Sequence, residues 1–145
     1  ATMLGEHGDS MVPIWSRVFI NGCHIDEYCR INGIAFSDED KVKMEDTVRN
    51  AGATVIKRKG ATYYAIATCV CEIVDTIIKN KNTILPLSTI LTGEYGISDV
   101  ALSLPSMLNA GGVQKRFEYS LTEKEQQLLL DSAEQIKNFL NQLAD

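Results

Sequence analysis

The hydrophobic pattern at the N-terminal end of the chain predicts short strands joined by tight turns. Short apolar segments bounded by glycine, proline or asparagine are typical of strands rather than helices. They cover residues 1–4, 13–20 and 23–25, and a brief helix is expected at residues 26–31. Asn21-Gly22 separates the second and third segments, and both of its residues accept the positive φ of a type I′ turn. The pattern therefore predicts a β-hairpin with its turn at Asn21-Gly22.

A helical period begins after this region. Ser37 is expected to cap the helix together with Asp40, three residues later, in a capping box. Apolar residues then recur at spacings of four, three and four, at Met44, Val48, Ala51 and Val55. Gly52 lies inside this helix, where glycine lowers stability, so it is expected to mark a close packing contact. Three basic residues precede Gly60, which is expected to end the helix.

Residues 62–80 predict a second long helix of a different character. Apolar side chains cover nearly the whole circumference of this segment. A helix that is apolar on all sides is usually buried on all sides. We therefore expect this helix to form the core of the domain, with its N-terminal end against whatever the domain encloses.

From Thr83 the period changes to two, which predicts strands. Alternating apolar residues fall in three runs, at residues 85–91, 100–104 and 113–119. Short turns between consecutive runs predict an antiparallel meander with one buried face. Pro105 is expected to end the second strand or to place it at an edge, because proline donates no hydrogen bond to a neighbouring strand.

A last helix is predicted from Thr122, with Glu125 as its capping-box partner. Its apolar stripe repeats at spacings of four, three, four and three, at Leu129, Ala133, Ile136, Leu140 and Leu143. Such a stripe can cover the domain's own sheet or contact a second subunit, and the own-sheet interpretation is favoured. Long helices together with an antiparallel meander predict an α+β fold.

Composition narrows the class of protein. The 145 residues are 45% hydrophobic and 23% charged, with a net charge of −5, as in an ordinary soluble domain. The acidic balance argues against a nucleic-acid partner, and no apolar run reaches the roughly 18 residues of a membrane helix. Cys69 and Cys71 cannot share a metal ion on one helix, and a metal at His24 and Cys23 is not favoured. The four cysteines are expected to be small core residues in a reducing, cytoplasmic compartment.

The strongest candidate for chemistry is the string Gly5-Glu6-His7-Gly8-Asp9-Ser10. Glycines on both sides of His7 let another molecule approach the backbone closely. Histidine is the side chain whose unperturbed pKa, about 6.5, suits proton transfer near neutral pH. Composition alone leaves open the alternative that His7 is an ordinary surface residue.

The string resembles the active-site motif of the L-lactate/malate dehydrogenase family, and Pro13 and Trp15 continue the resemblance. Residues 59–67 resemble the K-G-x-T-x-[WY]-[AG]-I-[AG] segment of lactate dehydrogenases, and residues 91–96 resemble the family's x-x-G-x-Y-G turn. The resemblance spans the chain in order. It implies that residues 1–145 are the catalytic, substrate-binding C-terminal domain, with long helices packed on an antiparallel sheet.

The resemblance also implies roles for three residues. His7 would donate and accept the proton in reversible hydride transfer between NADH and pyruvate. Thr62 would line the pocket for the C3 group of the substrate, and Ile66 would pack on the nicotinamide of NAD. The alternatives from the residues alone are that Thr62 caps a helix and Ile66 fills the core. Partners implied are a small 2-oxo or 2-hydroxy acid and further copies of the protein in a homo-oligomer.

Parts of the family's machinery have no match in this chain. The family's dinucleotide-binding half carries a G-x-G-x-x-G fingerprint, and no such string occurs here. Two arginines that act on the substrate and the aspartate that orients the histidine precede the motif in the family. We therefore expect a piece of a longer protein, separated from its Rossmann domain and inactive alone. Malate or another L-2-hydroxy acid as substrate, and a non-catalytic oligomerisation module, remain the alternatives.

Overall fold

The computed structural model describes residues 2–144, so Ala1, the first residue of one predicted strand, lies outside the described part. Its α-helices are α1 (Ile25–Ile31), α2 (Asp38–Arg49), α3 (Ala51–Lys59), α4 (Tyr64–Ile78) and α5 (Glu123–Ala144). Its strands are β1 (Met3–Leu4), β2 (Val12–Pro13), β3 (Phe19–Ile20), β4 (Cys23–His24), β5 (Thr83–Thr92), β6 (Ser98–Asn109) and β7 (Gly112–Arg116). Short 3₁₀ helices lie at Trp15–Arg17 and Glu94–Gly96.

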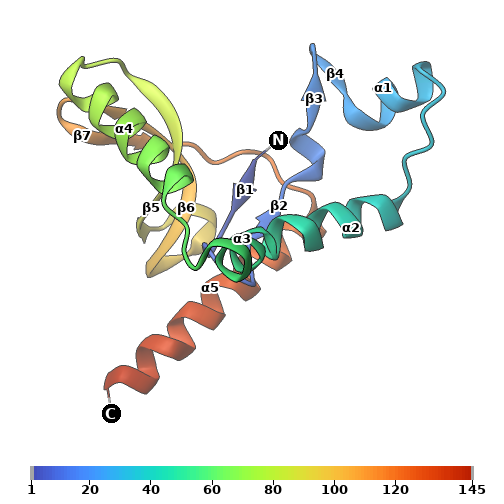
Figure 1. Cartoon of the computed structure of the whole chain (residues 1–145). Helices are drawn as coiled ribbons and strands as arrows, with labels where there is room; N and C mark the ends of the chain where they lie inside the picture. Colours follow the sequence, from blue (N-terminus) through green and yellow to red (C-terminus); the bar gives the residue numbers. More distant parts are fainter. Residues whose placement is uncertain (1, 145) are drawn as a thin grey trace.

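The largest sheet is the antiparallel meander β5–β6–β7, with β6 in the middle. The small sheet β1–β2 joins it through an antiparallel bridge between Gly5 and Ser103 of β6. The hairpin β3–β4 and α1 stand on the opposite side of the molecule from β5–β7 (Figure 1). Helices on antiparallel sheets confirm the predicted α+β class.

The core lies where β6, the sheet β1–β2 and the first half of α5 meet. Its buried side chains are Leu4, Val12, Ile14, Leu91, Ile97, Val100, Leu102, Leu104, Leu129 and Ala133. Alternate residues of β5 and β6 point toward this core, as their period of two predicts. The second half of α5 extends away from the body of the domain (Figure 1).

Several local predictions are confirmed. Asn21 and Gly22 both have positive φ and form the turn between β3 and β4. Ser37 and Asp40 form the full capping box at the start of α2. Thr122 and Glu125 bond reciprocally at the start of α5, with Glu125 N donating to Thr122 Oγ1 over 3.2 Å and Thr122 N donating to Glu125 Oε2 over 2.9 Å.

The prediction that residues 62–80 form the buried core is wrong. Thr76 is the one fully buried residue among the residues of α4, all of which are described. Its apolar side chains are largely exposed: Tyr64 80%, Ile66 57%, Val70 52%, Val74 45% and Ile78 77%. Cys69 and Cys71 are also exposed, against their predicted place in the core. The helix packs on β6 with one side, and the elements described between residues 2 and 144 leave its other sides uncovered.

The first long helix differs from its prediction in two ways. It is divided into α2 and α3 at Asn50, whose side-chain amide donates to the Asp46 carbonyl over 2.8 Å. Asparagine bonds that compete with the backbone ladder are a common cause of such breaks. Gly52 has no atom within 4 Å of the position of a Cβ, so the expected close contact is absent. The apolar face of the helix is also half exposed, at Met44, Val48 and Val55.

Two strand boundaries also differ from the prediction. The strand predicted at residues 13–20 is interrupted by the 3₁₀ helix Trp15–Arg17, and the return strand ends at His24. Pro105 does not end its strand, because it faces Pro86 of β5 at a position where neither proline needs to donate. On its other side Pro105 accepts from Phe117 N over 2.8 Å but can return no bond, and β7 ends at Arg116. Among residues 2–144, no helix combines the length and the apolar character needed to cross a membrane.

Candidate active site

The turn that carries His7 is fixed to the central strand of the large sheet. Gly5 N donates to Ser103 O over 3.1 Å, and Ser103 N donates to Gly5 O over 2.8 Å. The φ of Gly5 is +84°, which disfavours any residue with a side chain. The chain therefore leaves β1 and turns at Gly5 with its backbone anchored on β6.

The carboxylate of Glu6 closes the turn from inside. It accepts from Ser10 N over 3.2 Å and from the Ser10 hydroxyl group. A Cβ at Gly8 would collide with Glu6 Oε1 and push the carboxylate away from Ser10. Gly8 therefore leaves room for this carboxylate, and because its φ is not positive, a side chain there would displace Glu6 rather than strain the backbone.

Ser132 of α5 meets the same turn from the core. Its Oγ accepts from Glu6 N over 2.9 Å and lies 3.1 Å from Ser10 Oγ. A Cβ at Gly5 would lie only 2.7 Å from Ser132 Oγ. Ser132 is 1% exposed. Sequence reasoning missed this residue, although its place beside Ala133 on the buried stripe of α5 was a signal that its hydroxyl group would need a partner.

His7, unlike Glu6 and Ser10, makes no hydrogen bond that holds the turn. Its side chain is exposed, and no hydrogen bond to its ring forms within residues 2–144. It lines a cavity of about 300 Å³ together with Val48, Ala51 and Gly52 of α2 and α3. On another side it lines a cavity of about 540 Å³ with residues of β5 and β6, including Pro86 and Pro105. The imidazole therefore has open space on two sides in which a small molecule can approach it.

The structure does not bring Thr62 and Ile66 into contact with His7. Neither residue lines the two cavities beside His7. Thr62 is half-buried in the segment between α3 and α4, and Ile66 lies in the first turn of α4 with 57% of its surface exposed. The alternative structural roles fail, because Tyr63 rather than Thr62 occupies the N-cap position of α4 and Ile66 is outside the core. The site roles of both residues stay predictions.

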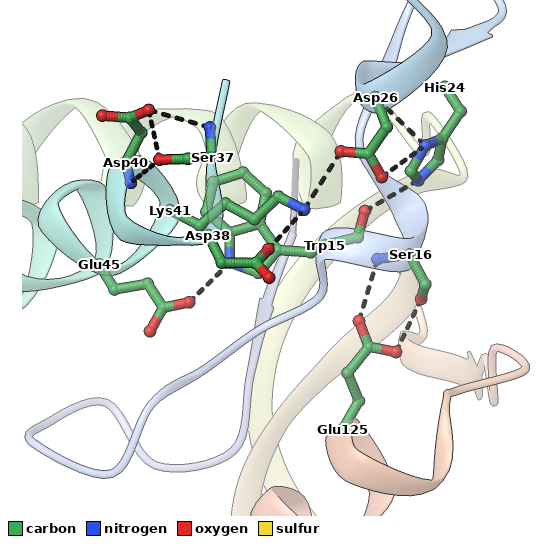
Figure 2. Close-up of polar contacts among 10 residues, drawn as sticks. All are labelled: Trp15, Ser16, His24, Asp26, Ser37, Asp38, Asp40, Lys41, Glu45 and Glu125. Carbon is green, nitrogen blue, oxygen red and sulfur yellow. Dashed lines mark hydrogen bonds and ion pairs between the residues drawn. The ribbon is translucent and has the colours of Figure 1, made fainter. Parts of the chain in front are cut away.

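A polar network secures the segment that follows the turn (Figure 2). The Trp15 indole donates to Glu45 Oε1 of α2 over 2.6 Å, and His24 Nε2 lies 3.2 Å from the Trp15 carbonyl. Lys41 pairs with Asp26 at 3.1 Å. Burial alone would lower the pKa of Lys41, but its bonds to Asp26 and Asp38 raise that pKa. Trp15, which continues the motif, is therefore tied to α2 and to the β3–β4 hairpin.

Glu125 secures the same segment to α5. Its carboxylate accepts from Ser16 N over 3.0 Å and from Ser16 Oγ over 2.7 Å, besides capping its own helix through Thr122 (Figure 2 for the Ser16 bonds). Burial would raise the pKa of Glu125, but the bonds from Ser16 and Thr122 outweigh it and lower the pKa. The exit from β2 is thus held by an ionised, buried carboxylate.

A fold of this topology, with a histidine turn anchored between β6 and α5, defines a class of dehydrogenase domain. The sequence profile of the lactate/malate dehydrogenase alpha/beta C-terminal domain matches residues 1–145. The chain belongs to the lactate/malate dehydrogenase family.

Individual relatives agree with this placement. An L-lactate dehydrogenase of Clostridium botulinum is 42% identical over 139 residues, which cover 96% of this chain and 44% of the relative. The solved L-lactate dehydrogenase of Clostridium thermocellum is 47% identical with a TM-score of 0.85, over 99% of this chain and 46% of that one. A malate dehydrogenase structure from Salinibacter ruber is 28% identical with a TM-score of 0.87, over 99% and 45%. The chain spans less than half the length of these relatives.

Proposed function

We propose that this chain is the substrate-binding and proton-transfer domain of an NAD-dependent L-lactate dehydrogenase that interconverts pyruvate and L-lactate. One observation carries the proposal: Gly5, Glu6, Gly8 and Ser10 build the turn, whereas His7 is left unbonded beside two cavities. A general acid–base residue must bring a ring nitrogen within hydrogen-bond reach of the group that it protonates. The names of the relatives at 42% and 47% identity support the choice of substrate.

In this proposal each site residue has one task. His7 donates a proton to the carbonyl oxygen of the 2-oxo acid during reduction and removes it in the reverse direction. Thr62 shapes the pocket for the methyl group of pyruvate. Ile66 presents an exposed apolar side chain, which fits the flat face of a nicotinamide ring and excludes water there. NAD supplies or takes up the hydride, and its dinucleotide part would be held by a Rossmann domain outside these 145 residues.

The proposal includes partners for the domain. The chain spans 44% of its C. botulinum relative, so its own dinucleotide-binding half is the first expected partner. The exposed apolar side chains of α4 and of the second half of α5 support contacts with that half and with further copies in a homo-oligomer. A cytoplasmic location fits the free cysteines. The isolated chain is expected to be inactive, because none of the residues described by the structure hydrogen-bonds to the His7 ring to set its orientation.

Reconstitution tests the proposal. The chain is co-expressed with the dinucleotide-binding half of a clostridial L-lactate dehydrogenase, and oxidation of NADH by pyruvate is followed. We expect activity from the pair, none from the chain alone, and loss of activity on His7→Asn with the fold retained. Asp9→Asn is the matched control, since Asp9 is exposed in the same turn. Robust pyruvate reduction by the chain alone, or full activity of the His7→Asn pair, would contradict the proposal.

A second candidate is a malate dehydrogenase domain. The malate dehydrogenase of Salinibacter ruber has nearly the same fold at 28% identity, so the fold alone does not select the substrate. Steady-state rates of the reconstituted enzyme with pyruvate, oxaloacetate and a branched 2-oxo acid distinguish the candidates. We expect pyruvate to have the highest kcat/KM, and a preference for oxaloacetate would reverse the assignment. A non-catalytic oligomerisation module would give no activity with any of the three.

A further inference from the structure

We infer that Ser132 of α5 is a positioning residue for His7 and holds it through a closed ring of hydrogen bonds. This inference rests on the proposed function of His7. It adds a residue that lies 125 positions along the chain from the histidine it would serve, on a helix that none of the motifs includes.

The direction of each bond in the ring follows from the donors present. Glu6 N–H can only donate, and it donates to Ser132 Oγ over 2.9 Å. Ser10 uses its one hydroxyl proton on the Glu6 carboxylate, so across the 3.1 Å between the two serines Ser132 is the donor and Ser10 Oγ the acceptor. The ring therefore runs from the backbone of Glu6 through Ser132 and Ser10 to the carboxylate of Glu6 itself. Bonds arranged head to tail in this way strengthen one another.

The ring fixes the residues on both sides of His7. Glu6 directly precedes the histidine, and Ser10 ends the turn three residues after it. Ser132 contacts both, and the missing Cβ of Gly5 is what lets Ser132 come so close. Between Glu6 and Ser10, the described residues show no hydrogen bond from the turn to the core other than those to Ser132. The bridge to β6 is made one residue earlier, by Gly5.

The helix that carries Ser132 is itself rigidly placed. Leu129 and Ala133, on the same buried stripe, are 0% and 4% exposed in the core. The position of α5 in the core is therefore transmitted to the backbone at His7 through one hydroxyl group. A proton donor must be held within a fraction of an ångström of its productive place, so loss of this hydroxyl should act on the chemical step more than on substrate binding.

Two variants and one matched control test the inference. Ser132→Ala removes the hydroxyl in the core, and Ser10→Ala breaks the same ring near the surface without opening a core cavity. Ser106→Ala is the control, because Ser106 is equally buried but bonds only the Leu104 carbonyl of its own strand. The chain has two histidines, so the His7 ring signal in an NMR spectrum is assigned by comparison with His24→Gln.

In the isolated chain we expect Ser132→Ala and Ser10→Ala to shift the His7 ring signal and to speed exchange of the Glu6 amide proton about tenfold or more. Ser106→Ala should leave both unchanged, and the double variant Ser132→Ala/Ser10→Ala should add little to either single one. An unmoved His7 signal in folded Ser132→Ala, or an equal shift in Ser106→Ala, overturns the inference. This measurement needs no activity, so it stands even where the proposed reaction fails.

In the reconstituted dehydrogenase we expect Ser132→Ala to lower kcat about tenfold or more with KM within about twofold of the parent. Ser10→Ala should lower kcat in the same way, and Ser106→Ala should leave kcat within about twofold. A rise in KM at unchanged kcat, or equal losses in Ser132→Ala and Ser106→Ala, would assign Ser132 a purely structural role and overturn the inference.

Discussion

The two long helices α4 and α5 differ in both apolar content and burial, and the two properties do not follow one another. Eleven of the fifteen residues of α4 are apolar, yet its one buried residue is the polar Thr76. The helix α5 is rich in glutamate, glutamine and lysine, yet its first half buries two polar residues, Glu125 and Ser132, at 6% and 1% exposure. The more polar helix is therefore the better buried one.

The difference shows what decides burial. The first half of α5 has β2 and β6 beside it. Its buried polar groups have hydrogen-bond partners in the turn at Glu6–Ser10, at Ser16 and at Thr122. The helix α4 packs mainly on β6 and presents Ile66, Val70 and Val74 to the surface. Contiguous exposed apolar surface of this kind marks an interaction site. The apolar composition of a helix indicates that its surface is suited to burial. Whether it is buried depends on which elements of the chain pack against it.

The largest expected effect on stability is in α5. Leu129→Ala removes a fully buried side chain from the core and should lower the free energy of unfolding by about 2–5 kcal/mol. The matched change in α4 is Val70→Ala, which should alter it by less than about 0.5 kcal/mol because Val70 is 52% exposed. Urea unfolding followed by circular dichroism measures both. Equal losses in the two helices would break the contrast.

A smaller effect is expected from the buried carboxylate of α5. Glu125→Gln keeps the shape but loses the charge that accepts from Ser16 and Thr122, so we expect a loss of about 1–3 kcal/mol at pH 7. The pKa of Glu125 is lowered on folding, so its stabilisation is present above the unfolded value of about 4.3 and disappears as the pH falls through the folded value.

Unfolding of both proteins between pH 7 and pH 3 measures this dependence. The difference between the parent and Glu125→Gln should stay constant down to about pH 4.5 and shrink below it. Glu123→Gln, at an exposed position in the same first turn, is the control. A difference that grows with acid would mean that burial, rather than the hydrogen bonds, dominates at Glu125.

The contrast also explains which parts of the fold could be predicted from sequence. Three predictions were confirmed because the interacting residues lie close together in the sequence. They are the Asn21-Gly22 hairpin, the capping box at Ser37 and the meander. The prediction failed for α4 because burial depends on neighbouring elements, and those described between residues 2 and 144 cover only one side of it. It failed at Pro105 because the pairing of two prolines across β5 and β6 depends on register, which periodicity does not specify.

The candidate site was predictable to a similar extent. The motif located His7, and the structure gives a physical reason for both of its glycines. The hydrogen bonds to Ser132 and the larger cavity beside His7 join segments that lie more than a hundred residues apart in the sequence. No local pattern encodes such contacts, so only the folded chain reveals them.

Gly52 tests whether α3, like α4, lacks close packing contacts. A Cβ at this position meets no atom within 4 Å, so Gly52→Ala should raise the free energy of unfolding by about 0.5–1 kcal/mol through helix propensity alone. Gly60→Ala, at a φ of +82°, should instead destabilise the chain. Urea unfolding of the two variants measures this difference in sign. A loss of stability in Gly52→Ala would reveal a packing contact at α3 in solution.

A substitution on the exposed apolar side of α4 is expected to change stability least and to affect association with other chains most. Val74→Lys places a charge on the exposed apolar side of α4 and should alter the free energy of unfolding of the isolated chain by no more than about 0.5 kcal/mol. The same change should weaken co-purification with the dinucleotide-binding half or lower the oligomeric state, because the buried lysine would lose its hydration. Gln126→Lys, on the exposed side of α5, is the control and should change neither. A loss of several kcal/mol in the isolated chain would mean that α4 is covered by the domain itself, and the contrast between the two helices would disappear.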